Sequence, residues 1–155
     1  PLSIWTINGT IIFEGNINFY QGTYVYVAQN GILHFGTKGT FIGSDTRIIC
    51  RNRIDIGNTV EITWENQIYD TSFHYISKDN QEPKSLTKSI FIGDNVWIGN
   101  RTTISKGAVI PQNSIIASNS IVNKDLSTYG ENCMFAGSPA DIKFKNINFS
   151  YDAYN

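Results

Sequence analysis

One histidine stands where its chemistry could serve catalysis. His74 ends the segment Asp70 to His74, DTSFH, and a polar stretch follows it directly. An imidazole with an ordinary pKa accepts a proton from a hydroxyl group near neutral pH, so this side chain suits general-base work. We therefore interpret His74 as a candidate general base. The alternative is a structural histidine held by hydrogen bonds.

Three neighbours are candidates to assist His74. Asp70, four residues earlier, is expected to orient the imidazole or to bind an acceptor hydroxyl, and the alternative is a solvated carboxylate in a turn. Tyr69 and Phe73 lie on either side of Asp70 and are expected to point outward. They are therefore candidate contacts for the acceptor. All of these roles need a rigid element that holds the segment at the surface.

The composition excludes several function classes. Only 16% of the 155 residues are charged and the formal net charge is -1, so no field over the whole sequence attracts nucleic acid or an anionic membrane. No apolar run is long enough to span a bilayer, and no charged-then-apolar leader opens the chain. We expect a soluble, cytoplasmic protein without membrane insertion.

The two cysteines, Cys50 and Cys133, are far apart and form no CxxC or Cys/His cluster. This spacing argues against a disulfide framework and against a thiolate metal site, and it favours a reducing compartment. Both residues are expected to be small buried hydrophobes without a role in the chemistry.

An uninterrupted six-residue repeat in the second half predicts the element that positions these residues. Six consecutive aliphatic hits in one register would arise by chance roughly once in ten thousand trials. A helix requires apolar spacings of three and four and a lone strand requires alternation, so neither explains the pattern. The repeat consists of Ile92, Ile98, Ile104, Ile110, Ile116 and Val122, each followed four residues later by Val96, Thr102, Ala108, Ser114, Ser120 or Leu126.

A period of six is typical of a triangular coil, in which each side is a short strand with one aliphatic side chain pointing inward. Turn residues stand where such a chain must bend: Gly93-Asp94-Asn95, Gly99-Asn100, Lys106-Gly107 and Gln112-Asn113. Stacked coils pair their strands in parallel, so each coil covers the apolar end of the next. The predicted fold class is therefore all-β, a parallel β-helix.

The same register extends upstream. It includes Ile42, Ile48, Ile56, Ile62 and Ile68, with a two-residue slip between Ile54 and Ile56, and it weakens into the pairs Phe35 with Phe41 and Ile11 with Ile17. We expect β-helix over 1–127, with early coils at 1–41 whose aromatic residues plug the end. The polar residues 75–89 are expected to form one extruded loop. A C-terminal extension follows at 128–155.

The run from Ile90 to Asp125 resembles the hexapeptide-repeat acyltransferases, similar to galactoside, maltose and serine acetyltransferases. Two flanking motifs strengthen the resemblance: DTSFH at 70–74 resembles the active-site strand of the family, and AGSPA at 136–140 resembles its exit motif AGxPA. The resemblance implies a left-handed coil, a homotrimer with sites between subunits, and acetyl-CoA as co-substrate, with no metal required. It also implies that His74 is the general base.

The mechanism that the resemblance implies is direct transfer of the acetyl group to a hydroxyl, without an acyl-enzyme. The tetrahedral oxyanion would meet the backbone N–H of Asn100, after Trp97. Trp97 itself is expected to lie outside the coil and to pack on pantetheine, on a sugar or on a second subunit.

The resemblance also assigns contacts to CoA. These are Asn100, Ser118, Asn123 and Lys124, and a lysine is a suitable point charge for the CoA phosphates. The family often has a basic residue directly after AGxPA, whereas Asp141 stands there in this sequence. Lys143 and Lys145 follow closely and are candidates to replace it.

Alternatives from other classes remain at this stage. β-Helical carbonic anhydrases bind a metal through three histidines, but the only histidines, His34 and His74, lie about two coils apart, too far to join one site. The residues include neither the helical domain of serine acetyltransferases nor the dinucleotide-type domain of many N-acetyltransferases. A saccharide O-acetyltransferase acting on a surface polysaccharide or its precursor is thus favoured. The alternatives are an N-acyltransferase for an amino sugar or small amine, and a non-catalytic structural or binding module.

Overall fold

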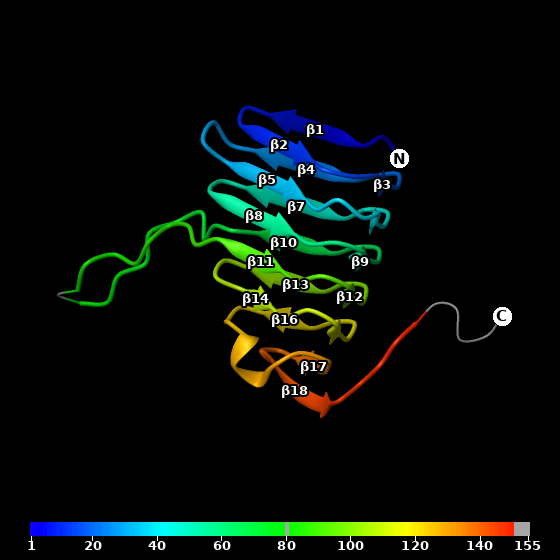
Figure 1. Ribbon diagram of the computed structural model, residues 1–155. Coiled ribbons are helices and arrows are strands. Elements are labelled where there is room, and N and C mark those ends of the chain that lie inside the picture. Colours follow the sequence, from blue (N-terminus) through cyan, green and yellow to red (C-terminus); the bar gives the residue numbers. More distant parts are fainter. Residues whose placement is uncertain (80, 151–155) are drawn as a thin grey trace.

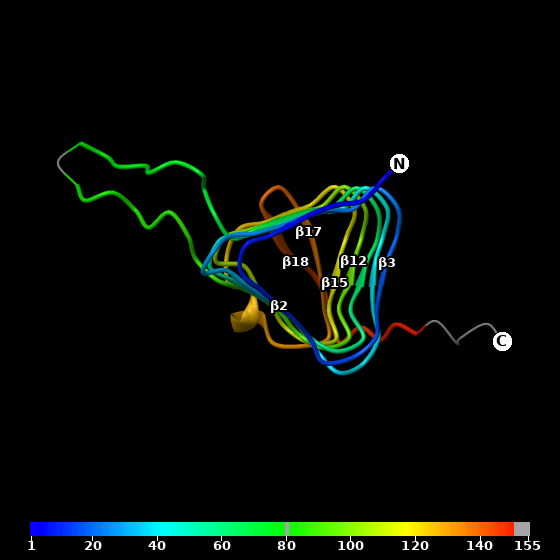
Figure 2. The same cartoon turned by 90° about the horizontal axis from the view of Figure 1, so that it is seen from above.

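The computed structural model describes residues 1–79 and 81–150 and shows a left-handed parallel β-helix. Three sheets form the sides of a triangular coil (Figures 1 and 2). Sheet A contains β1 (Ile4–Ile7), β4 (Tyr24–Val27), β7 (Arg47–Cys50), β10 (Gln67–Tyr69), β13 (Thr103–Ser105) and β16 (Ile121–Val122). Sheet B contains β2 (Thr10–Phe13), β5 (Ile32–Phe35), β8 (Arg53–Ile56), β11 (Ile90–Ile92) and β14 (Val109–Ile110).

Sheet C continues into the C-terminal part of the chain. It contains β3 (Ile17–Phe19), β6 (Thr40–Ile42), β9 (Glu61–Ile62), β12 (Trp97–Ile98), β15 (Ile115–Ile116), β17 (Cys133–Gly137) and β18 (Ala140–Lys145). Each strand pairs in parallel with the strand one coil away, except that β17 and β18 are antiparallel. Within the described residues, no helix is long and apolar enough to cross a membrane.

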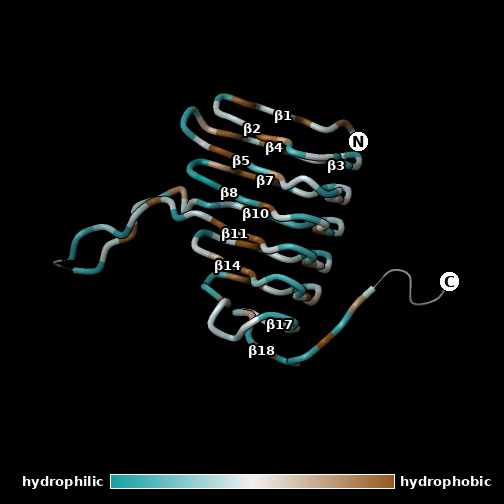
Figure 3. Tube along the Cα trace, in the orientation of Figure 1, coloured by the Kyte–Doolittle hydropathy of each residue, from teal (hydrophilic) through white to brown (hydrophobic). Residues whose placement is uncertain are grey.

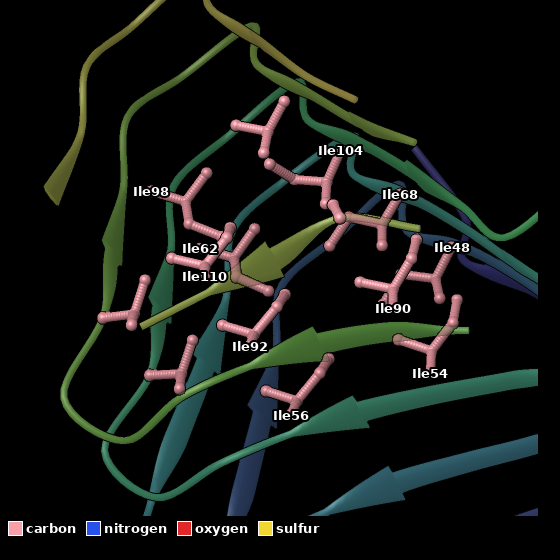
Figure 4. Close-up of a cluster of buried hydrophobic side chains, with 14 of the residues drawn as sticks. Ile48, Ile54, Ile56, Ile62, Ile68, Ile90, Ile92, Ile98, Ile104 and Ile110 are labelled. Carbon is pink, nitrogen blue, oxygen red and sulfur yellow. The ribbon is translucent and has the colours of Figure 1, made fainter. Parts of the chain in front are cut away.

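The core is a column of inward side chains, and the predicted six-residue register over 92–122 is confirmed. In sheet A, Ile68 pairs with Ile48 on one side and Ile104 on the other, so isoleucines stack on isoleucines (Figure 4). The repeat residues from Ile92 to Val122 are at most 3% exposed. The small residues that follow them are also buried, at the corners of the triangle. Figure 3 shows these apolar positions recurring along every coil.

The early coils follow a different register from the predicted one. The interpretation that Phe35 and Phe41 form an inward pair is wrong for Phe41, which lies half-buried on the outer face of β6 while Ile42 is buried. The turn between β5 and β6 is longer than a hexapeptide allows, so the inward position moves on by one residue. Phe35 is instead covered by Phe13 and Phe19, with ring centroids 5.4 and 5.7 Å away.

Left-handed residues make the corners of the triangle. We name the corners AB, BC and CA after the sheets that they join in chain order. The predicted turn residues Asn95, Gly107 and Asn113 have φ values of 52°, 80° and 55°. In the turn after Gly99, Arg101 adopts the positive φ, at 55°, rather than Asn100. Asparagine and glycine tolerate this region, and the turns can therefore repeat at short intervals.

The extruded loop leaves the coil at corner AB, between β10 and β11 (Figures 1 and 2). Its two arms run antiparallel at the base, where Thr71 bridges Thr87 and the N–H of Ser72 donates to the carbonyl of Leu86. Residue 80 of the predicted loop 75–89 lies outside the described residues.

The C-terminal segment closes the far end of the coil. A short 3-10 helix, η1 (Ser127–Tyr129), precedes the β17–β18 hairpin, and the AGSPA motif forms the turn of this hairpin. The chain then runs away from β18 along corner BC, where the N–H of Ile147 donates to the carbonyl of Asn132. Residues 151–155 of the predicted extension lie outside the described residues.

Candidate active site

His74 lies exposed at the base of the extruded loop, at corner AB. Its backbone N–H donates to the carbonyl of Ser72 over 2.7 Å, and Phe73 between them has a φ of 60°. Within the described residues, no side chain or backbone group contacts the imidazole through a hydrogen bond or ion pair. Both ring nitrogens are therefore available to a substrate.

The structure corrects the expectations for Asp70. Its side chain is fully buried, and its carboxylate accepts the backbone N–H groups of residues 51, 52 and 53 at 2.7 to 2.8 Å. Burial raises the pKa of this carboxyl, although the three N–H donors oppose the shift. Asp70 neither orients His74 nor reaches an acceptor. It ties the start of the loop to the turn one coil away.

The two aromatic candidates do lie on the outside near His74. Tyr69 is half-buried on the outer face of sheet A, and Phe73 is 46% exposed. Their ring centroids are 6.0 Å apart. Two neighbouring aromatic rings can pack against the apolar face of a sugar ring, so both residues remain candidate acceptor contacts.

Lys106 is a polar neighbour of this corner that sequence reasoning missed. It lies on the turn between β13 and β14, and its Nζ donates to Ser72 Oγ at 3.0 Å and to the carbonyl of Ser85 at 2.6 Å. The 34-residue separation from Ser72 hid the contact. The six-residue register contained the signal, because it places the 106–107 turn on the same corner as the loop.

The candidate oxyanion and cofactor residues Asn100 and Ser118 lie together at corner CA. Ser118 Oγ donates to Asn100 Oδ1 at 2.6 Å. Among the residues that the structure describes, no acceptor lies on the backbone N–H of Asn100. Trp97 precedes this corner on the outer face of sheet C, 38% exposed, with the ring of Phe149 at 6.5 Å.

The remaining cofactor candidates lie at the closed end of the coil. Asn123 and Lys124 follow β16, and Lys124 Nζ lies 3.4 Å from Asp141 Oδ1. Asp141, which departs from the family pattern, thus pairs with Lys124, the lysine that is expected to bind a CoA phosphate. Lys143 lies exposed on β18.

These residues form two groups on different corners of the triangle. His74, Tyr69, Phe73 and Lys106 belong to the loop base at corner AB, whereas Asn100 and Ser118 belong to corner CA. Sheet A separates the two corners within one chain (Figure 2). A site that uses both groups therefore needs two copies of the chain.

The sequence comparison agrees with the coil and its repeat. Residues 89–124 match the family described as bacterial transferase hexapeptide (six repeats). These residues are hexapeptide-transferase repeats. A 24.8 kDa protein of the cps region of Klebsiella pneumoniae is 38% identical over 151 residues, which is 96% of this chain. The chain spans 65% of the length of that relative.

Solved structures share the architecture. A hexapeptide-repeat acetyltransferase of Vibrio cholerae, in complex with acetyl-CoA, is 26% identical over 93% of this chain and 69% of its own, with a TM-score of 0.60. The polySia-specific acetyltransferase NeuO is 24% identical over 90% and 69% of the two chains, with a TM-score of 0.63. AntD, an N-acyltransferase of Bacillus cereus, shares the fold at 16% identity over 92% and 77%, with a TM-score of 0.72.

The second histidine lies in a different environment. His34 is on the outer face of β5, with Glu14 on one ring nitrogen and Asp55 on the other, both at 3.3 Å. Within residues 1–79 and 81–150, no group of three histidine, cysteine or acidic side chains is arranged to hold a metal ion. His34 thus lies between two surface carboxylates.

Proposed function

We propose that this protein transfers an acetyl group from acetyl-CoA to a hydroxyl of a saccharide, with His74 as the general base. The observation that supports this most directly is the state of His74: an exposed imidazole without a partner, at the base of the only loop that leaves a hexapeptide-repeat coil in the described part of the chain. The relative from Vibrio cholerae, named as an acetyltransferase and solved with acetyl-CoA, supports the choice of donor.

The chemistry is a direct displacement. One nitrogen of His74 takes the proton of the acceptor hydroxyl while the oxygen forms a bond to the acetyl carbonyl carbon. The carbon–sulfur bond then breaks, and the proton passes from the imidazolium to the departing CoA sulfur. The N–H of Asn100, which lacks an acceptor in the described residues, would donate to the developing oxyanion.

We propose further that the enzyme works as a homotrimer with three sites between neighbouring copies. The loop base at corner AB of one copy would meet corner CA of the next, which joins His74 to Asn100. A heterologous contact of this kind closes into a ring when the rotation is right. The exposed apolar side chains on the two flanking sheets, Phe91 at 45% on sheet B and Trp97 at 38% on sheet C, suit such a contact.

A saccharide is the acceptor that the outer surface near His74 supports best. Tyr69 and Phe73 offer aromatic faces, and NeuO, which has the same fold, is named as specific for polySia. CoA would lie between two copies, with Trp97 on pantetheine, and would be contacted by Asn100 and Ser118 at corner CA, by Asn123 and Lys124 at corner AB, and by Lys143 on β18. Lys124 must then exchange Asp141 for a phosphate.

An acceptor screen with acetyl-CoA and release of the CoA thiol as the readout tests the function. We expect release with hydroxyl acceptors of the saccharide class, and none after His74→Ala. Release with amino sugars alone would favour the N-acyltransferase, and no thermal shift with CoA would favour a non-catalytic module. Light scattering at micromolar concentration should give a trimer, and a monomer would exclude the shared site.

A further inference from the structure

We infer that Lys106 is a positioning residue for His74, which holds the base through a strained turn by binding Ser72. This inference rests on the proposed function, because it explains how the coil fixes the candidate base. None of the proposed contacts with acetyl-CoA or the acceptor involves Lys106.

The turn that presents His74 is conformationally expensive. The N–H of His74 bonds to the carbonyl two residues back, across Phe73 at a φ of 60°. Three-residue turns with positive φ are rare and strained, and a bulky aromatic residue rarely adopts this region. Such strain persists only where surrounding contacts hold it, and it is frequent at functional sites.

The contacts that hold the turn converge on Ser72. Its hydroxyl lies 2.9 Å from the carbonyl of His74 and 3.2 Å from that of Leu86, to either of which it can donate. The Oγ of Ser72 also accepts from Lys106 Nζ at 3.0 Å. A second bond, from the N–H of Phe73 to Thr71 Oγ1 at 3.0 Å, fixes the other side of the turn. Lys106 is thus linked to the backbone of His74 through Ser72, over two hydrogen bonds.

Lys106 also ties the two arms of the loop together. Besides Ser72 on the outgoing arm, its ammonium donates to the carbonyls of Ser85, at 2.6 Å, and Leu86, at 3.5 Å, on the returning arm. An ammonium has three donors and no acceptor, and here three oxygens surround it. The aliphatic stem comes from a turn of the rigid coil. The three hydrogen bonds of Lys106 therefore fix the base of the loop relative to the coil, whereas the rest of the loop projects into solvent (Figure 1).

Asp70 holds the opposite side of the same junction. Its carboxylate binds the turn one coil before the loop, while Lys106 belongs to the turn one coil after it. The loop base is therefore fixed from both neighbouring coils. Of the two residues, Lys106 is the one that bonds to Ser72, which in turn bonds to the carbonyl of His74. We therefore expect kcat to depend on Lys106.

The test compares Lys106→Met, which keeps the stem and removes the donors, with Lys106→Arg, which keeps donors. For Lys106→Met we expect kcat to fall by about ten- to a hundred-fold, as for a misplaced catalytic group, with an unchanged KM for acetyl-CoA. Lys106→Arg should restore most of the rate. The matched control is Lys38→Met, an exposed lysine in a turn at corner BC, which should leave kcat unchanged.

A second comparison separates positioning from general structure. In the His74→Ala background, Lys106→Met should lower the rate no further. In the otherwise wild-type chain, Ser72→Ala should lower kcat as much as Lys106→Met does, and the combination of the two should lower it no further. Lys106→Met losses that persist without His74, or a normal kcat in folded Lys106→Met, would overturn the inference. If His74→Ala itself leaves the rate intact, the proposed function fails first, and the two failures are thus distinguishable.

Discussion

The inner wall of the coil and the base of the extruded loop solve different problems with different chemistry. The wall is a stack of isoleucines, each in contact with equivalents one coil above and below (Figure 4). The loop base contains polar groups that occur once, among them Asp70, Ser72 and Lys106. The wall is repetitive, whereas each contact of the loop base is unique.

This difference separates stability from activity. Burial of one Ile side chain contributes about 1.5 to 3 kcal/mol, and the column contains many of them, so the wall provides most of the folding free energy. The loop base adds few apolar contacts, but it determines where His74 lies. Changes in the wall should therefore unfold the protein, while changes at the loop base should alter the rate in a folded protein.

The largest effect is expected for Ile104→Asp. The side chain of Ile104 is fully buried between equivalents in sheet A, and a carboxylate there has neither solvent nor a partner. We expect a loss of about 5 kcal/mol or more, enough to abolish folding of a typical domain. The measurement is circular dichroism and solubility. The control is Ile121→Asp on the outer face of the same sheet, where Ile121 is 37% exposed, and this variant should fold.

The next largest effect is expected for His74→Ala. Removal of a positioned base lowers turnover by about two to four powers of ten. Affinity for CoA and the thermal midpoint should barely change, since the imidazole is exposed and makes no hydrogen bond or ion pair in the described part of the chain. Turnover with the best acceptor, CoA titration and thermal unfolding together check this. Loss of activity only through unfolding would instead make His74 a structural residue.

The same difference explains how much the sequence predicts. The wall is predictable from the sequence because aliphatic residues recur every six positions. That period predicts the inward residues from Ile92 to Val122, which are buried. The register failed at Phe41, where one longer turn moves the inward position. A period cannot report the length of a turn.

The loop base was only partly predictable, because its contacts are between residues far apart in the sequence. The position of His74 before a polar loop is a local signal, and it was predicted. The burial of Asp70 follows from three backbone donors some 17 to 19 residues away, which no local pattern indicates. Lys106 looks like an ordinary turn lysine until the stacking of the coils brings it beneath Ser72.

An intermediate effect on folding stability is expected at high pH, from ionisation of the Cys50 thiol. Cys50 belongs to the wall, and its Sγ lies 3.8 Å from Oδ2 of Asp70. Burial, and next the charge of Asp70, raises the pKa of this thiol to about 12. A free thiol ionises near pH 8.5, so above that pH the unfolded chain loses a proton that the folded chain keeps. The stability that Cys50 contributes is therefore present at pH 8 and declines as the pH rises toward the folded pKa.

Urea unfolding at about pH 8 and about pH 10.5 measures this decline. We expect the wild-type chain to lose about 2 kcal/mol more than Cys50→Ala over this interval, because other titrating groups are common to both proteins. The alanine variant starts from a lower stability because of the cavity, so only the change with pH is compared. Equal declines would show that the thiol ionises as easily inside the coil as outside it.

The smallest effect is expected for Gly107→Ala, at the junction between wall and loop. Gly107 has a φ of 80°, and a Cβ there would lie 2.7 Å from Cδ of Lys88 on the returning arm of the loop. The positive φ alone costs roughly 1 kcal/mol for alanine.

Gly130→Ala is the matched control, since its φ is 88° and no atom lies within 4 Å of the added Cβ. Both variants should lose similar stability, but only Gly107→Ala should displace the Lys88 side chain on the returning arm, and we expect this displacement to lower kcat several-fold. Removal of the clash in Gly107→Ala with Lys88→Ala should recover kcat without recovering the backbone cost. Equal activity of the two glycine variants would mean that the loop base tolerates displacement and that the wall alone sets its position.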